Sequence, residues 1–337
     1  MTRENEASLV ALTTTLLGEA EGRSALDALA IDPRLLAERT PTVSRAVFAM
    51  AMNVALFHDL LRRTPSGAAY VADALRRGRR MTFDHGALRT IRLPEGPTGQ
   101  VPPGEDAFTR IFRPLGYEMA AVYPLDRLRM TGRAYRHADL PEAIPQFFLS
   151  ELHVDRFDPE CIEAAARVFG TTRDPLTEEA KAVLNRFAAG ESIGMDAAAR
   201  ALPSIVAAFD RHHAPPATED YELLLSRSSE AAWIATEGNA FNHATDRVDD
   251  VAALADRLKK DGAPIKDRLE ISASGRVRQT ALRADSVERE FAYGERRRVP
   301  GSFFEFISRD IDPATGRIDL AFDTGNATGI FAMTSYS

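Results

Sequence analysis

The chain has 337 residues, of which 45% are hydrophobic and 27% are charged, and these globular values argue against disorder. Its 49 acidic and 42 basic residues give a net charge of −7, whereas nucleic-acid binding normally requires a basic surface. No apolar stretch reaches the length of about 18 residues expected of a membrane-spanning helix. We therefore expect no nucleic-acid partner and no membrane partner, and the lack of a cleavage signal predicts a cytoplasmic protein.

The chain contains one cysteine, Cys161, so neither a disulfide framework nor a cysteine-based zinc site is possible within it. Residues 159–166 read as the first turns of a helix. A buried, small hydrophobic role is therefore predicted for this thiol.

Apolar spacing predicts that residues 1–80 are mainly helical, as in the long periodic run from Ser44 to Leu61. Residues 81–157 form a first β-rich part, which begins with an alternating strand over residues 81–93. Residues 158–236 read as a helical insertion, and residues 237–337 as a second β-rich part. The expected fold class is α+β, with residues 1–337 as a single elaborated domain.

The strand predicted at residues 81–93 carries His85 and Arg89. Side chains alternate between the two faces of a strand, so these two residues point to the same side. The histidine is then placed to bind a cation and the arginine to bind a carboxylate in one cavity.

His243 and Glu305 are the other candidate metal ligands. Two histidines and one carboxylate from separate strands form the open site of non-haem Fe(II) oxygenases. Alternation places Phe303 and Ile307 on the same face as Glu305, and a carboxylate among apolar neighbours needs a compensating cation. The alternative is that Glu305 lies on the solvent face of an edge strand.

Three motifs resemble those of the 2-oxoadipate dioxygenase/decarboxylase family, whose members are also called D-2-hydroxyglutarate synthases. They are Asp84–Thr90, Glu237–Arg247 and Phe303–Phe306, and the likeness extends from about residue 40 to the C-terminus. The resemblance implies a curved β-sheet related to the vicinal oxygen chelate superfamily, which encloses a metal site and is decorated with helices.

The resemblance further implies that Fe(II) is held by His85, His243 and Glu305, and that Arg89 binds the substrate carboxylate. The implied reaction converts 2-oxoadipate and O₂ to D-2-hydroxyglutarate and CO₂, as in lysine catabolism. His85 and His243 would then also border the bound substrate.

Three further residues are candidates for substrate binding. Arg247 and Arg309 follow His243 and Glu305 by four residues, so each either faces the cavity or forms a structural ion pair. The better-known bacterial members are longer towards the C-terminal half, and Ile330 lies in the segment expected to supply a backbone contact to the substrate.

Two other functions remain open on sequence grounds. One is a metal-dependent isomerase or lyase of the vicinal oxygen chelate type that does not use O₂. The other is a non-enzymatic binding module in which the histidines are structural. The sequence indicates no oligomeric state.

Overall fold

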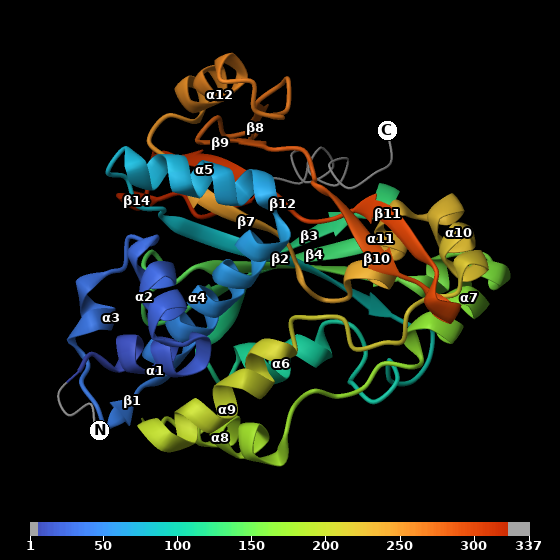
Figure 1. Cartoon of the computed structure of the whole chain (residues 1–337), viewed down its shortest axis with the longest axis horizontal. Helices are drawn as coiled ribbons and strands as arrows, with labels where there is room; N and C mark the ends of the chain where they lie inside the picture. The colour runs from blue at the N-terminus through green and yellow to red at the C-terminus, as the bar shows by residue number, and fades with distance from the viewer. Residues whose placement is uncertain (1–5, 323–337) are drawn as a thin grey trace.

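The computed structural model describes residues 6–322, and within them eight strands form one mixed sheet in the order β3-β4-β5-β2-β7-β12-β9-β8 (Figure 1). Two pairs, β2 with β5 and β7 with β12, are parallel, and the other neighbours are antiparallel. The sheet curls into a half-barrel. Its strands are β2 (Phe83–Arg92), β3 (Tyr117–Leu125), β4 (Met130–His137), β5 (Gln146–His153), β7 (Phe241–Arg247), β8 (Glu270–Ile271), β9 (Val277–Ala281) and β12 (Phe303–Arg309).

Helices α4 and α5 of the N-terminal region pack on β7 and β12, on one face of this sheet. Helix α4 begins after Ser44, whose hydroxyl accepts a hydrogen bond from the Val47 amide, and its apolar run is buried on almost every side. Phe57 of α4 and Tyr70 of α5 pack against Phe304 of β12. The helices are α1 (Ser8–Leu17), α2 (Glu19–Asp27), α3 (Pro33–Ala37), α4 (Arg45–Arg63) and α5 (Pro65–Arg76).

The helices between residues 158 and 236 lie in two separate places (Figure 1). Helices α8 (Glu178–Ala188) and α9 (Met195–Ala207) pair with each other, and α9 packs on α1 and α4. Helices α7 (Pro159–Phe169), α10 (Thr218–Arg227) and α11 (Ser229–Glu237) form a second group, in which α11 contacts β2. The segment predicted as one insertion thus supplies both the N-terminal core and one end of the sheet.

The remaining elements are short or peripheral. The hairpin of β10 (Ser286–Glu290) and β11 (Arg296–Pro300) is separate from the main sheet, and strands β1 (Thr42–Val43) and β6 (Ile193–Gly194) pair with each other. Other elements are α6 (Asp106–Phe112), α12 (Val251–Lys260), β13 (Ile311–Asp312), β14 (Arg317–Ile318) and the 3₁₀ turns η1 (Asp126–Leu128), η2 (Val154–Arg156) and η3 (Ala292–Gly294).

The expected fold class is confirmed: the chain is α+β, with a curled sheet, a helical N-terminal region and further helices between its two β-rich parts. Across residues 6–322, no helix has the length and apolar character needed to cross a membrane. The cytoplasmic location stays a prediction. Cys161 is buried in α7, as its sequence context predicted.

Candidate metal centre

Three neighbouring strands bring His85, His243 and Glu305 together on one face of the sheet. His85 of β2 and Glu305 of β12 both pair with Thr245 of β7, and His243 pairs with Ala87 of β2. The potential ligand atoms of the two histidines and the glutamate all lie within 4.8 Å of one another. Their exposed fractions are 1%, 4% and 0%, so the group is closed to bulk water. Glu305 lies on an interior strand, and the alternative of a solvent-facing edge strand is wrong.

A β-bulge in β2 places Asp84 beside the ring of His85. Phe83 pairs with Asp246 and His85 with Thr245, so Asp84 is an extra residue with no partner across the strand pair. Such a bulge turns a side chain away from the regular alternation. The Asp84 carboxylate lies 2.8 Å from His85 Nδ1, and the Thr245 hydroxyl lies 3.1 Å from Nε2. The carboxylate therefore accepts the Nδ1 proton. Nε2 accepts the Thr245 hydroxyl here, and it is the nitrogen whose lone pair could bind an ion.

A second bulge, in β7, places Asn242 beside the ring of His243. Ala87 pairs with His243 and Leu88 with Phe241, which leaves Asn242 as the extra residue. Its side-chain amide lies 3.0 Å from His243 Nδ1. As placed, it is the amide nitrogen of Asn242 that faces Nδ1, and the amide oxygen has no partner. Rotating the amide by 180° would let that oxygen accept the Nδ1 proton and would leave Nε2 its lone pair.

Glu305 meets His243 directly, with 3.0 Å between Oε2 and Nε2. Among the described residues, neither carboxylate oxygen of Glu305 has a hydrogen-bond partner, and neither does His243 Nε2. Buried polar atoms are normally paired, so three such atoms converging on one point indicate a missing partner. The Phe303 ring packs against His243 at a centroid distance of 4.8 Å, which keeps this side apolar.

Burial sets the protonation of the group when no cation is present. It raises the pKa of Glu305 well above the usual glutamate range and lowers the pKa of His243 well below the usual histidine range. Burial also lowers the pKa of His85, although Asp84 opposes this change. Without a cation, burial therefore favours the uncharged forms of the three side chains. A bound dication would reverse this preference for Glu305 and would supply the partner that His243 Nε2 and the Glu305 oxygens lack.

Arg89 lies on the same face as His85, towards α11. Its guanidinium is buried, with Nε 2.9 Å from Oε2 of Glu230, and it lies over the Trp233 ring at 4.8 Å from the centroid. Burial raises the pKa of Glu230, but the nearby guanidinium, which keeps its proton in proteins, opposes that shift. Helix α11 begins after Ser228, whose hydroxyl accepts from the Ala231 amide, and this start fixes the acid and the indole one turn apart.

The side chain of Arg309 is bound to Asp84, so the alternative of a structural ion pair describes it. Its Nη2 lies 2.9 Å from Oδ1 of Asp84 and its Nε lies 3.0 Å from Oδ2, while Nη1 donates to the carbonyls of Asp319 and Ala321. Arg309 and His85 hold the pKa of Asp84 far below its usual range, against the effect of burial. The acid is therefore ionised at any ordinary pH.

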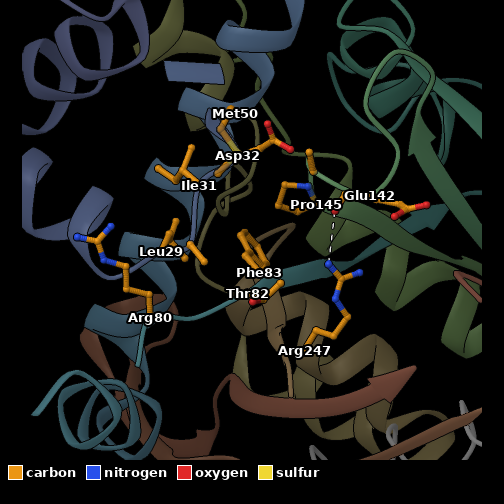
Figure 2. Close-up of a pocket in the computed structure, with 12 residues that line it drawn as sticks. Leu29, Ile31, Asp32, Met50, Arg80, Thr82, Phe83, Glu142, Pro145 and Arg247 are labelled. Atoms are coloured by element: carbon orange, nitrogen blue, oxygen red, sulfur yellow. Dashed lines mark hydrogen bonds between the residues drawn. The ribbon is translucent and has the colours of Figure 1, made fainter. Parts of the chain in front are cut away.

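Arg247 also points towards Asp84, at 3.7 Å from Oδ2. Its other side lines a pocket of about 370 Å³ between β2 and the N-terminal helices, where it donates to the Glu142 carbonyl at 3.4 Å (Figure 2). Apolar residues, including Phe83 and Met50, line much of this pocket. Ile330 lies outside the described residues.

Four residues with clear contacts to the site were missed by sequence reasoning: Asp84, Asn242, Thr245 and Glu230. Asp84 precedes His85 within the motif, but regular alternation assigns it to the opposite face. Thr245 follows His243 by two residues, so the same alternation would have found it. Glu230 lies on a helix, and nothing in the sequence indicates its contact with β2.

Residues 38–318 match the family of 2-oxoadipate dioxygenase/decarboxylase. The chain belongs to this family. Two plant proteins named 2-oxoadipate dioxygenase/decarboxylase are relatives: that of Arabidopsis thaliana is 24% identical, covering 75% of this chain and 68% of its own length, and that of Oryza sativa subsp. japonica is 23% identical, covering 77% and 70%.

Solved structures show the same fold. A glyoxalase superfamily protein from Ralstonia eutropha JMP134 is 48% identical, with a TM-score of 0.89 over 94% of this chain and 99% of that one. The hydroxyglutarate synthase of Oryza sativa, solved in complex with 2-oxoadipate, has a TM-score of 0.68 at 20% identity over 89% of this chain and 97% of its own. At 20% identity, the likeness to the Oryza sativa structure is evidence for a shared fold only.

Proposed function

We propose that this chain is an Fe(II)-dependent dioxygenase/decarboxylase that converts a 2-oxo diacid and O₂ to CO₂ and a 2-hydroxy diacid one carbon shorter. The most probable substrate by family is 2-oxoadipate, and the product would be D-2-hydroxyglutarate, as in lysine catabolism. The reaction balances, because the C1 carboxylate leaves as CO₂ with its own two oxygens. One atom of O₂ completes the new carboxylate at the former 2-oxo carbon, and the other becomes the hydroxyl of the product. The single observation that carries the proposal is the buried His85, His243 and Glu305 group with its unpartnered atoms.

The donor set supports iron. Two imidazoles and a carboxylate suit Fe(II), and thiolate plays no part because Cys161 is buried in α7. Three protein ligands leave coordination positions for substrate and O₂. When bound, the ion would supply oxygen activation and polarise the 2-oxo acid.

The protein's own contribution is to bind, orient and exclude water. His85 and His243 would each present Nε2 to the ion, with the Nδ1 protons held by Asp84 and Asn242. Arg89 supplies a fixed cation on the same face, suited to a substrate carboxylate. Burial of the ligands keeps competing water away from the reacting atoms.

The test is oxygen uptake by protein loaded anaerobically with Fe(II). We expect O₂ consumption with 2-oxoadipate, with one CO₂ and one 2-hydroxyglutarate formed per O₂, and D-configuration on chiral chromatography. Zinc-loaded protein is the control and should consume no O₂. Turnover of 2-oxo acids without O₂ would instead favour the isomerase or lyase alternative, and purified protein that binds no divalent metal would favour the binding module.

A further inference from the structure

Arg309 lies at the end of β12 with its side chain buried, and each of its nitrogens already donates a hydrogen bond. Two nitrogens hold the carboxylate of Asp84, and the third holds the carbonyls of Asp319 and Ala321 at 2.9 and 2.7 Å. A guanidinium bound in this way has little capacity left for a substrate carboxylate. Its role must therefore be sought in the groups that it holds.

The first of these groups is Asp84, which contacts His85 Nδ1 at 2.8 Å. A carboxylate in this place fixes both the ring orientation and the tautomer of a metal-binding histidine. Asp84 is the extra residue of a bulge, so the ladder does not hold it from across the strand pair. Asp84 is instead held by its hydrogen bonds to Arg309, and Nη1 of Arg247 lies 3.7 Å from its Oδ2.

The second group is the segment Asp319–Phe322, which we call the closing segment. Its Phe322 ring packs edge-on against His85 at a centroid distance of 4.8 Å and against Phe148 of β5 at 4.9 Å. The Phe322 amide donates to the Tyr123 hydroxyl at 3.0 Å, and the Arg309 guanidinium lies 5.2 Å from the ring centroid. The closing segment thus covers the first histidine on one side.

We propose that Asp84 and Arg309 are a positioning pair that together fix the orientation of the His85 ring. Asp84 turns Nε2 of His85 towards the metal ion, and Arg309 holds Asp84 in place while fixing the closing segment against the same imidazole. This inference rests on the proposed metal centre. It assigns Arg309 to metal retention and closure of the site, and not to substrate recognition.

The test compares metal affinity in Asp84→Asn, Arg309→Gln and Arg309→Lys, measured by chelator competition with Fe(II) under anaerobic conditions and with Co(II). We expect each of the first two to weaken metal binding by about 10- to 100-fold and to change the Co(II) absorption spectrum, because the histidine loses its fixed orientation. Arg309→Lys keeps the charge but loses the two-pronged contact, so an intermediate loss is expected. Hydrogen exchange in residues 319–322 should rise in both Arg309 variants and change less in Asp84→Asn.

Asp246→Asn is the matched control. Asp246 is a buried carboxylate on β7 that pairs with Arg79 at 2.5 Å and with Tyr70, but on the opposite face of the sheet. The control variant should lose thermal stability comparably yet keep its metal affinity within about twofold of wild type.

Metal affinities of Asp84→Asn and Arg309→Gln equal to that of Asp246→Asn, with only the KM for a 2-oxo acid raised, would overturn the positioning role and leave the proposed function standing. Wild-type protein that binds metal but never consumes O₂ would defeat the proposed function, while the metal affinities would still decide the positioning role. Wild-type protein that binds no metal would overturn both.

Discussion

The two halves of the sheet present the two candidate metal-binding histidines in the same way but hold them differently. In the β2 half, bulged Asp84 precedes His85 and contacts its Nδ1; in the β7 half, bulged Asn242 precedes His243 and contacts its Nδ1. Asp84 is charged and held by Arg309, whereas Asn242 is neutral.

The arginines four residues beyond the histidines differ as well. Arg89 stays on the metal face with Glu230 and Trp233, while Arg247 extends between Asp84 and a separate pocket (Figure 2). The shared spacing of four residues therefore decides which face of the sheet each arginine lies on. The neighbouring element decides what each arginine contacts. Under the proposed function, the β2 half would both hold a metal ligand and bind a carboxylate, whereas the β7 half would contribute mainly metal ligands.

The largest effect should come from the ligand that both halves share. Glu305→Gln removes the only negative donor of the group, and we expect metal affinity to fall by at least about 1000-fold. The metal-free variant should nevertheless unfold at a temperature no lower than that of metal-free wild type, because burial already disfavours the charged acid. Glu270→Gln is the control, since that nearby acid pairs with Lys266 outside the ligand group. Unchanged metal binding in Glu305→Gln would contradict the proposed centre.

The second prediction separates the two arginines. Arg89→Gln should weaken binding of 2-oxoadipate to the metal-loaded protein by about 100-fold, equivalent to about 2.7 kcal/mol, because charge-assisted hydrogen bonds to a carboxylate are lost. Arg247→Gln should change this affinity by less than about threefold. Isothermal titration under anaerobic conditions measures both. Equal losses in the two variants would show that the halves contribute equally to substrate binding.

The third prediction concerns pH. The raised pKa of Glu305 means that the metal-free protein keeps this acid protonated above the usual glutamate range, so metal binding must release that proton. Apparent metal affinity should therefore increase with pH by about tenfold per unit until the raised pKa is passed. The histidines, with lowered pKa values, compete with protons only at lower pH. Calorimetry in buffers of different ionisation enthalpy measures the proton release, and a pH-independent affinity would contradict the prediction.

The smallest effect tests the asymmetry of the bulges. Asn242→Ala removes a neutral partner of His243, so metal affinity should fall by about threefold, less than for Asp84→Asn. Chelator competition on both variants in parallel measures the difference. A larger loss for Asn242→Ala would mean that the β7 half is the better secured one.

Much of this arrangement could be predicted from sequence. Alternation placed His85 and Arg89 on the same face. It holds there because β2 pairs with β5 without interruption from His85 to Arg92. The grouping of His85, His243 and Glu305 came from the family resemblance, since residues so far apart carry no local signal of contact.

What escaped prediction depends on departures from regular structure and on tertiary packing. A bulge has no reliable sequence signature, so Asp84 was assigned to no role, and Arg309 and Arg247 were left between substrate and structure. The helices of residues 158–236 were read as one block, because amphipathic spacing shows that a helix has a buried face but not which surface covers it. Glu230 on α11 was missed for that reason.

The three donors project from strands that are hydrogen-bonded to one another, with Thr245 between two of them. Backbone pairing, and not the ion, fixes how far apart the donors stand. If the chain holds the metal that we propose, it should consequently fold to completion without that metal and bind it afterwards. Under the proposed function, a cell short of iron would then accumulate folded but inactive protein.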